Sequence, residues 1–588
     1  MRGLPRGSRV MATAVALTLA LAACGGDDDN DTAATPTATT GTTAATSPTT
    51  DASPTDTASP SPADTASPSP TDSPAGGTGE GKVTIAGCEP QNPLVPTNTN
   101  ETCGGGVVDA MFTGLINYKA EDASQEMAVA ESIEADAANK VYTIKIKADT
   151  KFHDGTPVTA KSFVDAWNYG AFGPNAQGNS YFFDPIKGFA EVQGEDADGD
   201  GKFEKKPEAE TMSGLKVVDD TTFTVELLEP SSSFPQRLGY TAFSPMPESF
   251  IKDPKAYEKA PVGNGPFKFV NFVSKANIDL TAFEDYNLPD KAKIKDLTFK
   301  VYANADSAYA DLISNNIDIQ ETIPTSALQG DKYKDDLGER VTEKPIGTFA
   351  SITFPEYIPA LKNTALRKAI SMAIDRDQVI SNIFNNTRIK ADGWVAPVVA
   401  GYKEGQCGEF CTFDAEKAKA QLKEAGGFDG TLTIGYNADG DHKDWIDAAC
   451  NSIKNTLEIK CQSKAYVDFA TLLKERAEKK MTGAYRTGWQ MDYPAIENFL
   501  TPLYATGASA NDSGYSNKEF DALVKKAATQ EGDEALATYQ QAEALLAKDM
   551  QVIPLWYGKL IAGHSENIET IKYTPFGTTD LASLTVKK

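Results

Sequence analysis

Hydrophobic and polar residues follow two periods along residues 82–588. Strict alternation predicts half-buried strands, and a spacing near 3.6 predicts helices with one buried face. The stretches with the strand pattern are 83–85, the half-buried strand within 133–147, a hairpin over 217–227, and 267–272, 278–283, 432–435 and 553–557. The stretches with the helix pattern are one that Thr159 caps, one over 364–386, one from Asp414 to Gly426, and 444–457, 518–528 and 533–549. This mixture predicts α/β or mixed α+β subdomains.

The first 24 residues have the pattern of a secretory signal. Three arginines lie within the first nine residues, an apolar run follows over 10–23, and small residues precede Cys24. Small residues directly before a Cys resemble the lipobox of bacterial lipoproteins, in which the Cys is acylated and becomes the mature N-terminus. We therefore expect a signal peptide over 1–23 and lipidation at Cys24. The alternative is an ordinary signal peptide with an incidental Cys.

The composition of residues 24–81 predicts a disordered tether between the lipid at Cys24 and the globular part of the chain that follows. Gly, Asp, Thr, Ala, Ser and Pro make up nearly all of this stretch, which is too poor in apolar residues to form a core. The whole chain has 56 Lys and Arg against 82 Asp and Glu, a formal net charge of −26. Such a charge argues against binding nucleic acid or anionic lipid. We expect an extracytoplasmic protein held at the cell membrane through its lipid alone.

Six further cysteines predict disulfides, because an even number in an exported chain is typical of them. Proximity in sequence favours the pairs Cys88–Cys103, Cys407–Cys411 and Cys450–Cys461. The alternative is a metal site. It is disfavoured because the three histidines, His153, His442 and His564, lack zinc-like spacing with these cysteines.

Motifs that resemble catalytic signatures are incomplete. Residues 76–82 (GGTGEGK) match a phosphate-binding loop, but Val83 stands where Ser or Thr is needed. Residues 249–252 (SFIK) match Ser-x-x-Lys without its companion motifs. We therefore expect no catalytic residues, although a hydrolase using carboxylates is kept as an alternative.

One acidic loop resembles a calcium loop. Asp196, Asp198 and Asp200 take its first, third and fifth positions, and Gly201 takes the sixth. Pro207 replaces the bidentate Glu expected at position twelve. The alternatives are a Ca²⁺ site and a solvated acidic surface loop. We expect no other cofactor.

Six segments spread along the chain carry a resemblance to a known family. They are 152–160 (FHDGTPVTA), 261–267 (PVGNGPF), 366–376 (LRKAISMAIDR), 488–500 (GWQMDYPAIENFL), 514–521 (GYSNKEFD) and 552–555 (VIPL). In this order they resemble the family 5 solute-binding proteins of ABC importers for oligopeptides and dipeptides. Each segment alone is weak evidence, but six in the same order are strong.

The resemblance implies an α/β, mixed α+β fold of the periplasmic-binding-protein type. It is a bilobal clamshell with an additional domain, which closes on its ligand by hinge motion. We place lobe I at 82–108, 235–326 and 558–588, the additional domain at 109–234, and lobe II at 327–557.

The same resemblance implies a ligand site. In peptide-binding relatives the Asp of the motif around GWxxDY binds the peptide α-amino group, and it maps to Asp492. Trp489 would wall the cleft, and Arg486 matches a position that brings positive charge near the ligand carboxylate. Trp394 is a further candidate for the wall. The alternatives are a loop or helix cap for Asp492, core packing for Trp489 and a surface salt bridge for Arg486.

The implied function is capture of small peptides and their delivery to ABC permease subunits driven by a cytoplasmic ATPase. The chain departs from the family pattern at Met491 and at 495–497, so the peptide preference is open. Oligosaccharides or a metal chelate are alternative ligands on the same fold, and a structural or sensory lipoprotein is a further alternative. We expect a monomer.

Overall fold

The computed structural model describes residues 81–195, 203–438, 440, 442–508 and 510–588. The signal peptide, Cys24, the tether up to residue 80, and Asp196, Asp198 and Asp200 lie outside the described residues. The predictions made for them therefore stay predictions.

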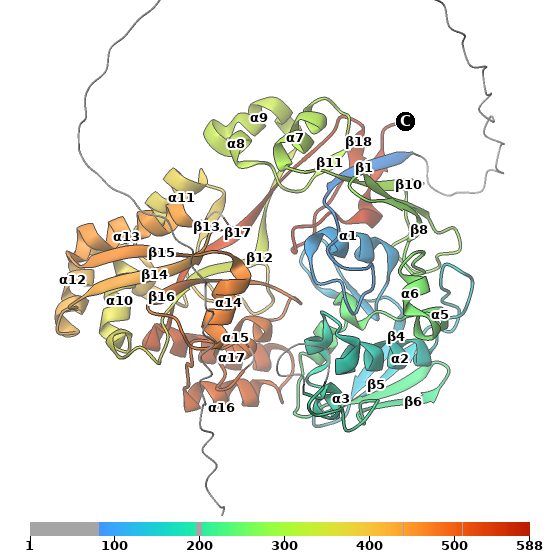
Figure 1. Cartoon of the computed structure of the whole chain (residues 1–588), viewed down its shortest axis with the longest axis horizontal. Helices are drawn as coiled ribbons and strands as arrows, with labels where there is room; N and C mark the ends of the chain where they lie inside the picture. The colour runs from blue at the N-terminus through green and yellow to red at the C-terminus, as the bar shows by residue number, and fades with distance from the viewer. Residues whose placement is uncertain (1–80, 196–202, 439, 441, 509) are drawn as a thin grey trace, which may run out of the picture. The chain divides into compact units, whose positions relative to one another are not determined.

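One large mixed sheet runs through the described chain (Figure 1). β1 pairs in parallel with β10, and β14 pairs in parallel with β15, whereas most other neighbours are antiparallel. The sheet confirms the predicted mixed α/β class. In spatial order its strands are β15 Lys460–Tyr466, β14 Thr431–Asn437, β16 Ala484–Gln490, β12 Val341–Thr353, β17 Val552–His564, β11 Ile319–Gln320, β1 Lys82–Gly87, β10 Asp296–Val301, β9 Asn277–Ala282 and β8 Phe267–Val273, with β13 Arg388–Lys390 also on β17.

Two large hydrophobic cores lie along this sheet. The first is formed by residues between 83 and 299 together with C-terminal residues such as Leu584, and the second by residues between 349 and 557. β17 contributes to both, since Leu560 belongs to the first core and Leu555 to the second. The paired strands β12 and β17 thus pass from one core to the other, as Figure 1 shows.

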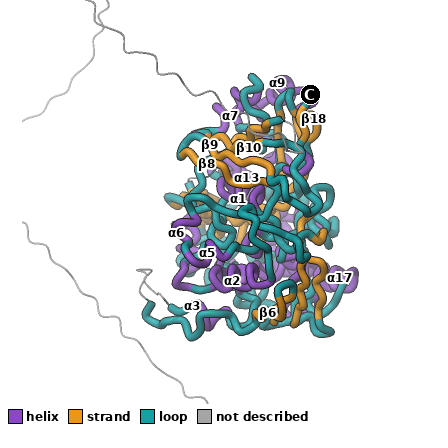
Figure 2. Tube along the Cα trace, turned by 90° about the vertical axis from the view of Figure 1, so that its right-hand side faces the viewer, coloured by secondary structure: helices purple, strands orange, loops and turns teal. Residues whose placement is uncertain are grey.

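A separate four-stranded antiparallel sheet shares the first core. Figure 1 labels three of its strands, β4, β5 and β6, and Figure 2 labels β6 from the side. Its order is β4 Ala130–Ala135, β5 Val141–Ile146, β7 Thr222–Glu226 and β6 Leu215–Asp219. The range 133–147, predicted to hold one half-buried strand, therefore contains β5 and part of β4. The predicted helix after Thr159 is α2, Ala160–Ala171, and its Trp167 ring lies 5.5 Å from that of Phe223. The short pairs are β2 Ile116–Tyr118 with β3 Gln125–Met127, and β18 Ile568–Thr570 with β19 Thr585–Val586.

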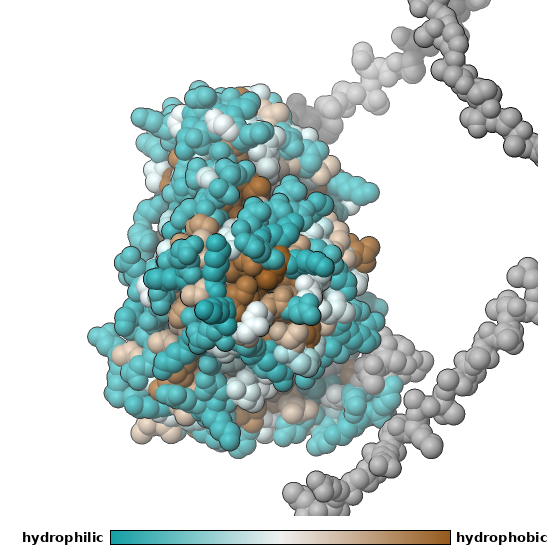
Figure 3. Space-filling model, turned by 90° about the vertical axis from the view of Figure 1, so that its left-hand side faces the viewer, coloured by the Kyte–Doolittle hydropathy of each residue, from teal (hydrophilic) through white to brown (hydrophobic). Residues whose placement is uncertain are grey.

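Helices cover these sheets and join their strands. In the first half of the chain they are α1 Thr102–Met111, α3 Phe189–Gln193, α4 Phe234–Arg237, α5 Glu248–Lys252, α6 Pro254–Tyr257, α7 Ala305–Ile313, α8 Thr325–Leu328 and α9 Lys332–Leu337. In the second half they are α10 Thr364–Met372, α11 Arg376–Phe384, α12 Ala415–Glu424, α13 Lys443–Leu457, α14 Phe469–Ala477, α15 Ile496–Tyr504, α16 Lys518–Ala527 and α17 Gly532–Asp549. The face drawn in Figure 3 is mostly hydrophilic, as the many charged residues predict.

The prediction of one helix over 364–386 is wrong. The chain forms α10 and α11 with a break between them, because Asp375 caps α11 by accepting a hydrogen bond from the Gln378 N–H at 3.0 Å. An Asp side chain competes with the helical backbone in this way. The apolar spacing continues across the break, since Ile374 is fully buried, so periodicity alone does not show it.

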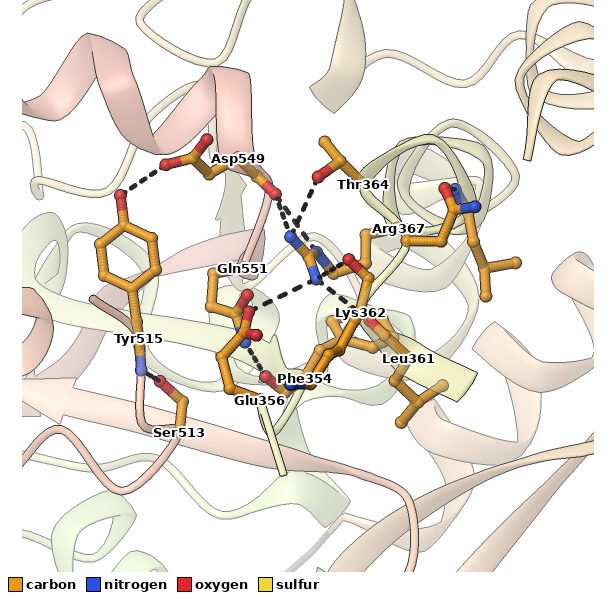
Figure 4. Close-up of polar contacts among 12 residues, drawn as sticks. Phe354, Glu356, Leu361, Lys362, Thr364, Arg367, Ser513, Tyr515, Asp549 and Gln551 are labelled. Atoms are coloured by element: carbon orange, nitrogen blue, oxygen red, sulfur yellow. Dashed lines mark hydrogen bonds and ion pairs between the residues drawn. The ribbon is translucent and has the colours of Figure 1, made fainter. Parts of the chain in front are cut away.

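Arg367 in α10 is a structural hub of the second core (Figure 4). Its side chain is 4% exposed, and its Nη2 donates to the Asp549 carbonyl at 2.7 Å. Nη1 donates to the carbonyls of Leu361 at 3.1 Å and Lys362 at 3.0 Å. This arginine, which carries part of the family resemblance, therefore joins α10 to the end of α17 and to the chain before α10.

The structure contains the three predicted disulfides, Cys88–Cys103, Cys407–Cys411 and Cys450–Cys461. Among the described residues, no helix combines the length and hydrophobicity that a membrane span requires. The same part of the chain holds no group of three or more His, Cys, Asp or Glu arranged to bind a metal ion.

Candidate functional site

The edge of β16 is the first feature of the site. Met491 N–H donates to the Gly347 carbonyl in β12 at 2.8 Å. Because successive strand residues direct their backbone groups to opposite edges, those of Gly488 and Gln490 point away from β12. On that side β14 pairs with β16 only at Ala484 and Tyr485. Within the described chain, no strand therefore covers the edge beside Gly488 and Gln490.

The space beside Gly488 is open. A Cβ added there would meet no atom closer than 3.5 Å, and the nearest is the Phe349 carbonyl oxygen. Packing within the fold therefore does not require glycine at this position. Because glycine has no side chain, the backbone at Gly488 is accessible to a ligand.

Asp492 lies directly after β16, at the end of this edge. Its Oδ2 accepts a hydrogen bond from Asn498 Nδ2 at 3.0 Å, and its N–H donates to Asn498 Oδ1 at 3.0 Å. Burial raises the pKa of the Asp492 carboxyl to about 6, although the Asn498 hydrogen bond and the charge of Arg237 oppose this shift. A desolvated carboxylate with one neutral donor favours a cationic ligand group.

Trp489 is held at the same place by the same asparagine. Its Nε1 donates to Asn498 Oδ1 at 3.0 Å, and its ring is half-buried. It lines a cavity of about 390 Å³ together with Phe469, Leu473 and Gly488. The structure thus holds Trp489 and Asp492 through the same Asn498 side chain, and Trp489 lines a cavity beside the open edge. Contact of either side chain with a ligand stays a prediction.

The Arg486 side chain, also from β16, contacts Asn437 and Phe469. Its Nε donates to Asn437 Oδ1 at 2.8 Å, and its guanidinium lies over the Phe469 ring at 4.9 Å from the centroid. Phe469 also lines the cavity, so Arg486 lies at its border. A contact between Arg486 and a ligand carboxylate stays a prediction.

Trp394 lies elsewhere. It is 1% exposed in the second core, and its Nε1 donates to the Val552 carbonyl at 3.1 Å. Its N–H also donates to Glu543 Oε1 at 2.9 Å. These contacts are those of a core residue, and we do not include Trp394 in the site.

Three tyrosines and one arginine lie near enough to Asp492 for their side chains to interact with its charge, and sequence reasoning missed them. The charge of Asp492 adds to the effect of burial in raising the pKa values of Tyr118, Tyr181 and Tyr240. Arg237 Nη2 donates to the Tyr493 hydroxyl, next in sequence to Asp492, at 3.0 Å. These residues come from segments more than 250 residues before Asp492, and no local pattern signals their proximity.

A family model identifies the family of the chain. Bacterial extracellular solute-binding proteins, family 5, match residues 125–511, which is more than half of the chain. This chain belongs to that family. Its members bind substrates for transport and are not enzymes, which confirms the prediction of a non-catalytic, extracytoplasmic binding protein.

Individual members of the family are similar to this chain in sequence and in structure. The oligopeptide-binding protein OppA of Bacillus subtilis is 25% identical over 82% of this chain and 90% of its own length. The unliganded open form of the murein tripeptide binding protein MppA has a TM-score of 0.73 at 22% identity, covering 86% of this chain and 97% of that one. OppA of Haemophilus influenzae, solved with the peptide RPPGFSPFR, has a TM-score of 0.67 at 22% identity and covers 87% and 99%. At these identities the structural likeness shows the fold.

Proposed function

We propose that this protein is the lipid-anchored substrate-binding subunit of an ABC importer. It captures short peptides outside the cytoplasm and delivers them to a membrane permease driven by a cytoplasmic ATPase. The observation that carries this proposal is the placement of Asp492 at the end of the open edge of β16.

This placement matches the chemistry of a peptide. An extended peptide can add to a free strand edge through its backbone, which requires no particular side chains. The carboxylate of Asp492 at the end of that edge then receives the α-ammonium group in a charge-assisted hydrogen bond. The cavity beside Trp489 gives room for a ligand side chain. The related OppA solved with a bound peptide supports this ligand class.

An irregularity in the strands that join the two cores supports the proposed closure. The β12–β17 ladder shifts register between Pro345 and Phe349, close to where these strands pass from the first core to the second. Gly558 faces this point in β17, and a Cβ there would lie 1.8 Å from Thr348 Oγ1. We propose that the strands bend here. The assignment of 82–108, 235–326 and 558–588 to lobe I, 109–234 to the additional domain and 327–557 to lobe II is part of this proposal.

Binding of unmodified peptides to the full chain tests the function. Calorimetry with di- to pentapeptides should give saturable binding, and mass spectrometry of the gently isolated protein should find peptides bound to it. If no peptide binds while an oligosaccharide or a metal chelate does, the peptide reading is wrong and one of the alternative ligands replaces it.

The proposed anchor depends on Cys24, the one position with a lipidation signal. Replacing Cys24 with Ser should release the protein into the medium, because no acyl chain can then attach. Partition between detergent and aqueous phases measures this. A Cys24→Ser protein that still partitions with detergent would contradict the lipoprotein proposal.

A further inference from the structure

The cavity beside Trp489 has a floor with a definite chemistry that the proposed function does not use. Its volume of about 390 Å³ is typical of a site for a small ligand group. The floor is one face of the β12–β16 pair (Figure 1), because alternate residues of β12 stand opposite alternate residues of β16. The facing pairs are Phe349 with Trp489, Ser351 with Thr487 and Thr353 with Tyr485, and all six residues line the cavity.

Three hydroxyl groups, those of Ser351, Thr353 and Thr487, form a cluster on this floor that we call the hydroxyl triad. Thr487 Oγ1 lies 2.6 Å from Ser351 Oγ and 2.7 Å from Thr353 Oγ1. The three groups have three protons, and their two mutual hydrogen bonds use two of them. Within the described residues, none of the three donates to any other acceptor. One proton of the triad is therefore left for an acceptor from outside the protein.

Helix α14 forms an apolar wall beside this floor. Phe469 and Leu473 lie about one turn apart on the same face of α14, and both line the cavity. They are 41% and 39% exposed, so this wall reaches the surface of the protein. Leu503 and Tyr504 of α15 line the cavity as well. The cavity therefore presents aromatic and aliphatic surface to a ligand and opens to solvent beside α14.

The lining of the cavity has no net charge. Among the described residues that line it, Arg476 and Asp512 are the ionised ones, and Arg476 Nη2 lies 2.8 Å from Asp512 Oδ2. Their side chains are only 13% and 20% exposed, so each charge is balanced by the other in a largely desolvated place. A ligand ammonium or carboxylate entering here would lose its water without gaining an unbalanced counter-charge. The cavity thus favours a neutral ligand group.

The cavity lies close to the proposed site for the peptide amino end. Trp489 Nε1 and the N–H of Asp492 both donate to Asn498 Oδ1, each at 3.0 Å. A residue of the cavity floor and the proposed ammonium ligand are therefore held by the same oxygen atom. A short peptide whose amino end lies at Asp492 has its own side chains within reach of this cavity.

We propose that this cavity makes the protein selective for peptides with a tyrosine side chain. The inference rests on the proposed function, since Asp492 would hold the α-ammonium group. A tyrosine side chain has an apolar ring and a neutral polar tip. The ring packs between the aromatic floor and the wall of α14, and the phenol oxygen accepts the remaining proton of the hydroxyl triad. Phenylalanine fills the same apolar space but leaves that proton without a partner, which costs affinity in a desolvated site.

Calorimetry on matched tripeptides tests the proposal with the full chain. Tyrosine, phenylalanine, lysine or glutamate replaces alanine at each position of trialanine in turn, always with a free amino end. At one position or more, the native protein should bind the tyrosine peptide at least tenfold more tightly than trialanine and than the lysine and glutamate peptides. At that position it should bind tyrosine about three- to tenfold more tightly than phenylalanine, as expected for one hydrogen bond.

The triple variant Ser351→Ala/Thr353→Val/Thr487→Val tests the hydroxyl triad. It removes all three hydroxyls together, so that none is left buried without its partner, and it nearly keeps the side-chain shapes. The ratio of affinities for tyrosine and phenylalanine peptides should fall below about twofold. The matched control is Thr143→Val/Ser213→Ala/Thr431→Val, which removes three exposed hydroxyls elsewhere and should keep the native ratio. Circular dichroism verifies that both variants are folded.

The outcomes separate this inference from the proposed function. Equal binding of tyrosine and phenylalanine peptides to the native protein at every position would overturn the inference, and this readout needs no variant. Tightest binding of a lysine or glutamate peptide would overturn it too, as would a tyrosine preference that persists in the folded triple variant. In each of these cases peptides still bind, and the proposed function stands. Absence of binding by every peptide would overturn the proposed function and the inference with it.

Discussion

Asp492→Asn is expected to weaken binding of peptides with a free amino end by about ten- to a hundredfold. The substitution keeps the shape of the side chain and removes its charge. A charge-assisted hydrogen bond in a desolvated setting contributes roughly 1.5–3 kcal/mol, and each factor of ten in affinity corresponds to about 1.4 kcal/mol. Calorimetry on the native protein and the variant measures the loss.

N-acetylated peptides complete a two-by-two design for Asp492. They should bind the native protein poorly and lose little further in Asp492→Asn, because the ammonium is already absent. Asp377→Asn is the matched control, since Asp377 is an exposed carboxylate paired with Lys390. Equal losses for free and acetylated peptides would show that Asp492 holds the loop with Asn498 and does not bind the ligand.

The pH dependence of peptide affinity gives a second test of Asp492. The carboxyl pKa is raised to about 6 in the free protein. Binding an ammonium requires the ionised carboxylate, so affinity for neutral-side-chain peptides should be highest near pH 7 and fall as the pH drops through 6. This acid limb should be absent in Asp492→Asn. An unchanged pH profile in the variant would assign the limb to another group.

Arg367→Met is expected to lower the free energy of unfolding by roughly 3–5 kcal/mol, the largest stability effect that we predict. Methionine keeps much of the side-chain volume but donates no hydrogen bonds. The carbonyls of Leu361, Lys362 and Asp549 would then be left without the donor that the native structure provides. Urea unfolding followed by circular dichroism measures the shift in midpoint.

Lys362→Met is the control for Arg367→Met. It removes the same charge from a neighbouring exposed residue, and the carbonyl of Lys362 stays in place. Its midpoint should differ little from that of the native protein. Equal midpoints for the two variants would contradict the structural role given to Arg367.

Local sequence patterns predicted most of the secondary structure correctly because strand alternation and helix capping are local properties. Thr159 begins α2 and Asp414 begins α12, as expected. The prediction failed where a polar side chain overrode the periodicity. Asp375 divides the helix predicted over 364–386, although the apolar spacing continues through it.

The sequence by itself determined the family, the mixed α/β class, the cysteine pairs and the candidate Asp492, because ordered motifs and short loops do not depend on distant contacts. Only the tertiary structure decided what surrounds Asp492. Arg237 and the tyrosines Tyr118, Tyr181 and Tyr240, whose hydroxyls feel the charge of Asp492, come from separate parts of the chain. The tertiary structure also placed Trp394 in the core and Trp489 beside a cavity. Both are tryptophans in similar local sequence, and burial is set by packing between segments far apart in the chain.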